Sequence, residues 1–171
     1  MRTPRVLPAL VALTGSVLAA ALLAAPARAG TATIEDPLGD GVPTQDLTTV
    51  QLLNTATEFR ITATVEGLRA GPQQLLSAEV RSASGEVYTV VTVRSKDGEV
   101  STDVLRPAGM DPIPCDERAR WRLRIDRIVV RVPRGCLDDG GPLRVRLAVG
   151  FGDGGSGDPT DVTRTRRVVQ D

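Results

Sequence analysis

The feature that most constrains this chain is the alternation of apolar and polar residues along most of its length. The clearest example is the segment 58–66, where four apolar residues occupy every second position: Phe59, Ile61, Ala63 and Val65. Side chains of a β-strand point alternately to its two faces, so this period predicts strands with one buried and one solvent-facing side. Such strands are typical of antiparallel sheets.

The same pattern predicts about nine strands, joined by segments rich in glycine, proline and aspartate. No segment after the first 30 residues shows a helical period with capping residues. We therefore expect an all-β fold, an antiparallel β-sandwich of about nine strands. A β-barrel is the alternative, because alternation alone does not separate the two architectures. The expected strands span residues 31–35, 46–53, 58–66, 73–82, 86–94, 99–105, 119–125, 128–132 and 143–151.

Residues 1–29 have the pattern of a secretory signal peptide. Arg2 and Arg5 precede an uncharged apolar run, and Ala27-Arg28-Ala29 supplies a small-x-small cleavage site. The run is weakly hydrophobic and ends at this site, which favours a cleaved signal helix over a membrane anchor. We expect residues 30–171 to form a single secreted, extracellular domain with no membrane insertion after cleavage.

The charge of the expected mature domain is slightly negative. The leader holds three arginines and no acidic residue, so residues 30–171 carry 18 basic and 21 acidic side chains, a net charge of −3. This balance argues against nucleic acid as a partner. A basic stripe does alternate with apolar residues, and we expect it to be the solvent-exposed side of a strand whose Trp121, Leu123 and Ile125 face inward. The stripe consists of Arg118, Arg120, Arg122 and Arg124.

Two absences restrict the possible functions. The chain contains no histidine, which excludes Ser-His-Asp and Cys-His catalysis and every zinc site that needs histidine. Only four aromatic residues occur (Trp121, Tyr88, Phe59 and Phe151), whereas nucleic-acid grooves need rings for stacking. A hydrolase that uses paired carboxylates is a remote alternative. We expect a monomeric, non-enzymatic binding or interaction module whose extracellular ligand or protein partner is unknown.

Cys115 and Cys136 are the only cysteines, and they flank a predicted hairpin that turns at Asp126-Arg127. If Ile125 and Ile128 face each other across this turn, the two cysteines lie within two residues of facing each other at the open end. In an exported protein this placement predicts a disulfide. Its closure would stabilise the fold by about 3 kcal/mol. A redox pair would have a spacing such as C-x-x-C, which this chain lacks.

Two loops rich in aspartate and glycine, residues 36–41 and 152–161, are candidates for a calcium site. Calcium prefers oxygen ligands from carboxylates and carbonyl groups, and the loops would meet at one edge if the terminal strands are neighbours. Neither loop has EF-hand spacing, and aspartate and glycine are also ordinary turn residues. A calcium-stabilised structural or cell-surface protein is therefore the alternative to a cofactor-free binding module. The candidate calcium ligands are Asp36, Asp40, Asp46, Asp153, Asp158 and Asp161.

Two motifs resemble those of small, uncharacterised secreted proteins of actinobacteria. One is the D-P-x-G-D segment at 36–40, and the other is the C-D…V-P-R-x-C-L pattern that runs from Cys115 to Leu137. The resemblance implies a β-sandwich with a disulfide-linked hairpin and implies no activity. The chain departs from the pattern at the acidic pair Asp116-Glu117, which lengthens the loop before Trp121. It also departs at Asp161-Val162, where an aromatic residue is expected.

Overall fold

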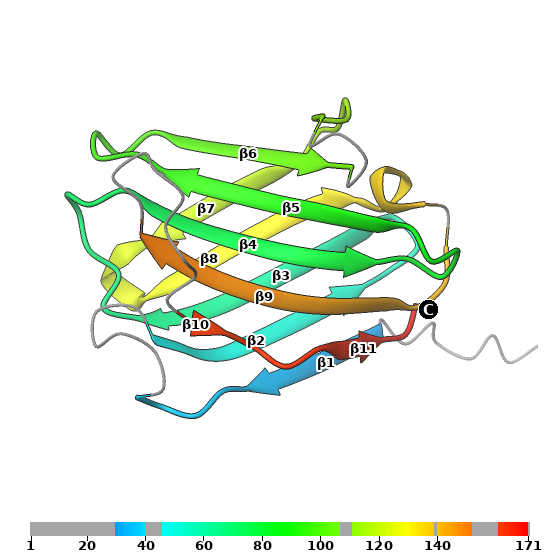
Figure 1. Cartoon of the computed structure of the whole chain (residues 1–171), viewed down its shortest axis with the longest axis horizontal. Helices are drawn as coiled ribbons and strands as arrows, with labels where there is room; N and C mark the ends of the chain where they lie inside the picture. Colours follow the sequence, from blue (N-terminus) through cyan, green and yellow to red (C-terminus); the bar gives the residue numbers. More distant parts are fainter. Residues whose placement is uncertain (1–29, 40–45, 107–110, 139, 152–160, 171) are drawn as a thin grey trace, which may run out of the picture.

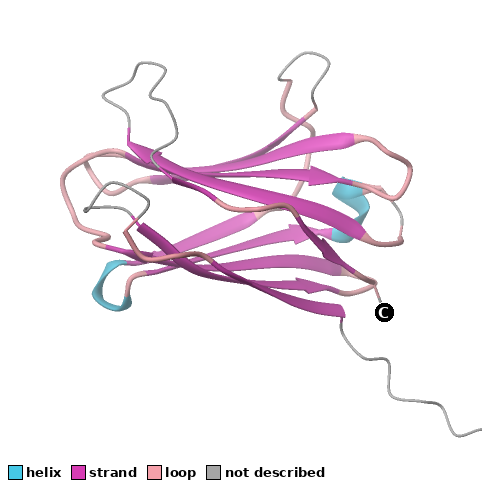
Figure 2. Ribbon diagram, turned by 60° about the horizontal axis from the view of Figure 1, so that its bottom comes forward, coloured by secondary structure: helices cyan, strands magenta, loops and turns pink. Residues whose placement is uncertain are grey.

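The computed structural model describes residues 30–39, 46–106, 111–138, 140–151 and 161–170. Two antiparallel sheets pack face to face and do not close on each other, as the edge view in Figure 2 shows. The predicted β-sandwich is therefore confirmed, and the barrel alternative is not what the chain forms. Within the described residues, no helix is long and apolar enough to span a membrane. The predicted signal peptide lies outside them.

The first sheet has the strand order β1-β2-β3-β8-β7, and the second has the order β10-β9-β4-β5-β6, with β11 also paired to β9 (Figure 1). The strands of the first sheet are β1 (Gly30–Glu35), β2 (Asp46–Asn54), β3 (Glu58–Glu66), β7 (Arg118–Arg122) and β8 (Arg127–Pro133). Those of the second are β4 (Gln74–Arg81), β5 (Val87–Arg94), β6 (Val100–Leu105), β9 (Leu143–Phe151), β10 (Asp161–Val162) and β11 (Arg166–Val168).

The alternation identified in the sequence builds the core between the sheets. On β3, Phe59 and Ala63 are fully buried, while Arg60, Thr62 and Thr64 point to the outer face. Strand β3 pairs with β2 on one side and β8 on the other, so its inward residues lie in the middle of the first sheet. All nine predicted strands are present with ends that differ by a few residues.

Strand β2 differs from its predicted pattern at one end. Strict alternation places Thr48 on the same face as Val50 and Leu52, but the pairing with β3 shifts register between Leu47 and Thr49. A bulge of this kind places an extra residue on one strand and changes which side chain faces the core. As a result Leu47 is fully buried and Thr48 is half-buried.

The two short strands β10 and β11 were not predicted. Both pair with β9, where Asp161 lies opposite Val149 and Arg166 lies opposite Val145. Strand β11 also lies beside β1 (Figure 1). The approach there is so close that a Cβ atom placed on Gly30 would overlap the carbonyl group of Val169. Only glycine fits the start of β1 without displacing the backbone.

The connection between β7 and β8 is longer than predicted. Residues Leu123–Ile125 form a 3-10 turn, and Asp126 has a left-handed backbone with φ of 49°. Trp121 therefore lies opposite Ile128, in place of the predicted Ile125. The expectation that Ile125 faces inward is wrong, since it is 51% exposed.

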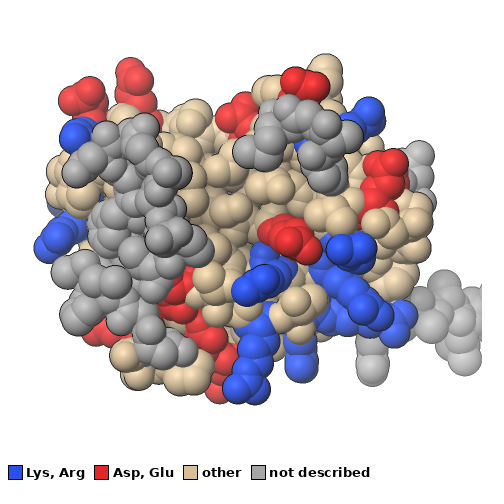
Figure 3. Space-filling model, viewed as in Figure 1, with Lys and Arg blue, Asp and Glu red and all other residues tan. Residues whose placement is uncertain are grey.

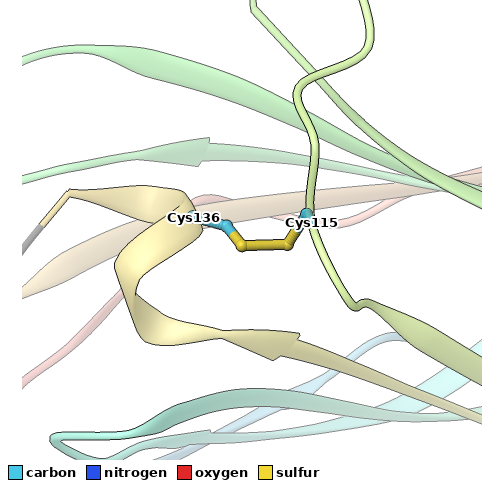
Figure 4. Close-up of a disulfide and its surroundings, with 2 residues drawn as sticks. All are labelled: Cys115 and Cys136. Carbon is cyan, nitrogen blue, oxygen red and sulfur yellow. A yellow bond between two sulfur atoms is a disulfide. The ribbon is translucent and has the colours of Figure 1, made fainter.

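The predicted disulfide is confirmed. Cys115, in the segment before β7, bonds to Cys136 with a Cα–Cα separation of 6.1 Å, and Figure 4 shows Cys136 on the short 3-10 helix after β8. This separation is within the usual range for a disulfide. The bond joins the two chain segments at the open end of the β7–β8 hairpin.

A buried arginine shapes the same end of the hairpin. Arg134 is 2% exposed, and its guanidinium group donates hydrogen bonds of 2.7–3.1 Å to four backbone carbonyl groups. The acceptors belong to Leu137, Asp138, Gly140 and Gly141. A buried charge needs such compensation to be tolerated. The V-P-R-x-C-L motif therefore supplies residues that close the open end of the hairpin: the buried Arg134, the disulfide-bonded Cys136 and the fully buried Leu137.

Candidate functional site

Six arginines project from the outer face of the first sheet. They come from three adjacent strands, because alternation places three arginines of β7, two of β8 and one of β3 at outward positions. We call this surface the arginine face. It consists of Arg60, Arg118, Arg120, Arg122, Arg127 and Arg131.

The strand register brings these arginines directly opposite one another. Arg131 on β8 lies opposite both Arg118 on β7 and Arg60 on β3. At the other end of β7, Arg122 lies opposite Arg127. Directly opposed residues have Cβ atoms about 5 Å apart, and like charges in such pairs destabilise a sheet. The arginine face therefore contains three arginine–arginine cross-strand pairs, and like charges at such positions oppose its stability.

The arginine face is hollowed. A shallow cavity of about 400 Å³ is lined by the six arginines together with Thr62 and Val129. Thr62 and Val129 are the shorter outward residues between the arginine pairs. The hollow therefore has a floor of small side chains and a rim of guanidinium groups.

Carboxylates hold the arginines at one end of this face. Glu58 forms ion pairs with Arg60, at 2.5 Å, and with Arg131, at 3.8 Å, and Asp116 pairs with Arg118 at 3.0 Å. The other three arginines of the face are Arg120, Arg122 and Arg127. Among the described residues, no carboxylate oxygen lies within 4.0 Å of their side-chain nitrogens.

Protection of the sheet edge is the simplest structural explanation of these charges. Strand β7 is an edge strand, and charged side chains on edge strands prevent pairing with other molecules. This explanation covers the three arginines of β7. It does not cover those of β3 and β8, because both strands are paired on each side.

The outer face of the second sheet is different (Figure 3). Its arginines gather over β9 and β11, where Arg144 lies opposite Arg81 and Arg167. A neighbouring arginine, Arg146, lies opposite an acid, Glu79. The hollow on this sheet has a volume of about 270 Å³ and is lined by one arginine, one carboxylate and five uncharged residues. Positive charge is therefore less concentrated on this face.

Aromatic rings are turned away from the arginine face. Phe59 and Tyr88 are 0% and 2% exposed. Trp121 packs against the core, and its indole nitrogen donates a hydrogen bond of 3.2 Å to the Thr92 hydroxyl on the second sheet. These are the three rings whose side chains the structure describes. The arginine face therefore offers charge and hydrogen-bond donors without a stacking platform.

Three of the six predicted calcium ligands lie in the described residues. Asp46 and Asp161 are both 6% exposed, and each accepts a backbone hydrogen bond, from Gly39 at 2.6 Å and from Leu47 at 2.7 Å. Asp36 is half-buried after β1. Asp161 lies close to Asp46, since its carboxylate accepts the hydrogen bond from Leu47, the next residue.

The carboxylates of Asp46 and Asp161 therefore accept hydrogen bonds from backbone N–H groups. Within the described residues, no group of three or more acidic side chains could hold a metal ion. The other candidates, Asp40, Asp153 and Asp158, lie outside these residues. The calcium site therefore stays a prediction, which a comparison of melting temperatures with and without millimolar calcium tests.

A second polar cluster surrounds Asp138. Its carboxylate accepts hydrogen bonds from the hydroxyl groups of Ser84, Ser82 and Tyr88 at 2.5–2.9 Å, and these bonds lower the pKa of Asp138. Burial, together with the nearby carboxylates of Asp138 and Glu86, raises the pKa of Tyr88. The cluster ties the β4–β5 hairpin to the segment after the disulfide. Each described member of the cluster forms a hydrogen bond with at least one other member, which indicates a structural role.

Alternation in the sequence predicts only half of the arginine face. Arg118, Arg120 and Arg122 are exposed on β7 as expected, whereas Arg124 lies on the 3-10 turn and outside the face. Arg60, Arg127 and Arg131 were missed. Alternation already placed them outward, but only the pairing of β3 with β8 brings them beside β7.

Comparison with models of protein families finds no matching family, and comparison with curated proteins finds no match either. The assignment of a function therefore depends on the surface described above.

Proposed function

We propose that this protein is a secreted, non-enzymatic binding module that captures an anionic ligand on the arginine face. One observation carries the proposal: three strands place six arginines around one hollow, in three directly opposed pairs. Like-charge pairs oppose folding. An anion bound between the arginines would remove their mutual repulsion, and this gain would favour binding of the ligand.

The disulfide and the leader support an extracellular location for this binding. Disulfides persist in oxidising compartments, and residues 1–29 have the pattern of an export signal. The absence of histidine removes the commonest general base, which supports a binding role over a catalytic one.

Matched variants on the two faces test this proposal. The triple variant Arg120→Ser/Arg122→Ser/Arg127→Ser removes the three arginines of this face that have no carboxylate partner among the described residues. The control, Arg81→Ser/Arg144→Ser/Arg167→Ser, removes three exposed arginines of the second sheet and changes the net charge equally. Binding of inorganic polyphosphate and heparin is measured by calorimetry at several salt concentrations.

Only the first variant should weaken binding. For a flexible polyanion, the slope of log affinity against log salt should fall by about 2, because each lost contact contributes about 0.7. Equal losses in both variants would mean that binding follows net charge, and the proposal would be rejected. Failure of the natural protein to bind either polyanion at low salt would also reject it.

A further inference from the structure

Building on the proposed function, we infer that the ligand is a linear, base-free polymer of phosphate groups that lies extended along β7. Arg118, Arg120 and Arg122 occupy alternate positions of this edge strand. Outward side chains of a strand repeat every 6.7 Å or so, so the three arginines span about 13 Å. A regular line of charges of this length matches a ligand that repeats charged groups along a chain.

A second line of arginines runs parallel to the first. Arg127 and Arg131 lie on β8, which is about 4.8 Å from β7 in the sheet. Val129 lies between these two arginines and opposite Arg120, so the hollow separates the pair Arg118–Arg131 from the pair Arg122–Arg127. A chain extended along this trough meets one arginine pair at each end and Arg120 beside its middle. A compact anion would contact only one of the two pairs.

The chemistry of the donors favours phosphate. All six cations are arginines, as are 20 of the 21 basic residues of the chain. Guanidinium groups present a planar fork of N–H donors that bonds to phosphate or carboxylate through two parallel hydrogen bonds. A phosphate group also keeps free lone pairs after one such contact. One phosphate can therefore bond to Arg122 and Arg127 from opposite strands.

Carboxylate polymers fit this surface less well. Glu58 and Asp116 already supply carboxylates to Arg60, Arg131 and Arg118. These partners belong to the same chain, so they act at a high effective concentration that a soluble carboxylate must overcome. A polymer whose only groups are carboxylates would replace these contacts with equivalent ones.

The absence of rings on the face separates a base-free polymer from nucleic acid and from sugars. Single-stranded nucleic acids gain about 1–3 kcal/mol for each base that stacks on an aromatic side chain. Phe59, Tyr88 and Trp121 all lie away from the arginine face. The described surface therefore contacts the charged backbone and offers bases and pyranose rings no aromatic platform.

Calorimetry with defined probes tests the ligand class. The probes are inorganic polyphosphate and poly(glycerol phosphate), with heparin, poly-L-glutamate and oligo(dT) of equal charge as competitors. Both base-free phosphate polymers should bind at least about tenfold more tightly than the three competitors, a difference of about 1.4 kcal/mol. Whichever of these two polymers binds more tightly shows whether the phosphates of the ligand are joined directly or through a polyol. A competitor that binds equally well or better overturns the inference and leaves anion binding at this face intact.

The shape of the ligand is tested with two probes that carry six phosphates each. A linear hexaphosphate should bind more tightly than myo-inositol hexakisphosphate, because only the chain spans the trough. Equal or reversed affinities would overturn the extended binding mode. If none of these probes binds the natural protein, the proposed function itself fails.

The role of the planar guanidinium group is tested by replacing arginine with lysine, which keeps the charge but lacks the fork of N–H donors. The variant Arg120→Lys/Arg122→Lys/Arg127→Lys should lose about tenfold in polyphosphate affinity while the salt slope stays the same, because the charges remain and the paired hydrogen bonds are lost. Urea unfolding checks that the variant is folded. Unchanged affinity in the folded variant would overturn phosphate recognition by the fork.

Discussion

Arg122 and Arg127 lie directly opposite each other, and the structure gives neither a carboxylate partner among the described residues. We expect Arg127→Thr to raise the free energy of unfolding by about 0.2–1 kcal/mol, because it removes a like-charge pair and introduces a residue that favours strands. Urea unfolding at low salt measures this gain. The gain should shrink at high salt, where exposed charges are screened.

A matched substitution on the other sheet controls for the loss of an arginine. Arg146→Thr also removes an exposed strand arginine, but Arg146 lies opposite Glu79. Its loss should leave stability unchanged or slightly lower it, because the removed pair is attractive. If Arg127→Thr destabilises the protein as much as or more than Arg146→Thr, the arginine face is not under repulsion.

Asp138 should make the stability of the protein depend on pH in acid. Hydrogen bonds from Ser84, Ser82 and Tyr88 lower the pKa of its carboxyl group in the folded state. Its stabilising contribution is therefore present above the carboxyl pKa of the unfolded chain and is lost as pH falls through the folded value. Unfolding in urea between pH 6 and about pH 2 should show a smaller pH dependence in Asp138→Asn than in the natural protein.

The same variant leaves the arginine face untouched, so its polyphosphate binding at neutral pH serves as a control. An identical pH dependence in both proteins would show that other carboxylates govern acid unfolding. A loss of binding would instead connect the cluster to the arginine face.

Among the structural elements, the β7–β8 hairpin depends most on a covalent constraint. The Cys115–Cys136 bond closes a loop with a sequence separation of 21 residues. The variant Cys115→Ser/Cys136→Ser should lose about 3 kcal/mol of unfolding free energy in the chain-entropy model. Urea unfolding of this variant and of the natural protein under reducing conditions should give similar midpoints.

The outcome for binding follows from the position of the bond. Both cysteines lie at the end of the hairpin where Glu58 and Asp116 hold three of the arginines. The reduced protein should therefore keep its affinity for polyphosphate where it remains folded. Two accessible thiols in the natural protein under oxidising conditions would contradict the pairing.

Long strands could be predicted from the sequence, but short elements and turns could not. Strand β3 has nine residues of unbroken alternation, whereas β10 and β11 have two and three residues and form only because β9 offers an open edge. The turn at Leu123–Ile125 carries apolar residues that continue the strand pattern, so nothing local marks its start. The disulfide was predicted correctly although the register of the hairpin was not. In both the predicted and the observed register, the two cysteines lie within two residues of facing each other.

The arginine face could be predicted only in part, because alternation describes one strand at a time. Alternation shows on which face of its own strand an arginine lies. It does not show which strands are neighbours, and β3 pairs with β8 across more than sixty intervening residues. The acidic loops were the more conspicuous sequence feature. In the described residues, however, Asp46 and Asp161 accept backbone hydrogen bonds, from Gly39 in a turn and from Leu47 on β2.

For the whole molecule, the charge of the face and the net charge have opposite signs. Residues 30–171 carry a net charge of −3, yet the arginine face is basic. At an ionic strength of 0.15 M the screening length is about 8 Å, so a polyanion at the face interacts mainly with nearby arginines. Near 0.01 M this length is about 30 Å, and acids elsewhere on the molecule also repel the ligand.

The salt dependence of binding should therefore be curved. The plot of log affinity against log salt should be linear above roughly 0.05 M and flatten toward 0.01 M, because long-range repulsion grows as screening weakens. Calorimetric titration with polyphosphate over this range measures the curvature. A straight line throughout would show that the acidic residues are too distant or too evenly spread to affect binding.

The close approach of Gly30 to Val169 brings the first strand and the last segment of the described domain together at one end of the sandwich (Figure 1). A short peptide linker can therefore join these positions, and the chain can be reopened in the Ser95–Glu99 hairpin loop between β5 and β6. Exposed loops of this kind tolerate new termini. A circular permutant made in this way keeps β3, β7 and β8 uninterrupted. If the arginine face binds polyanions as proposed, the permutant supplies a binding scaffold whose two ends leave from the sheet opposite the arginines.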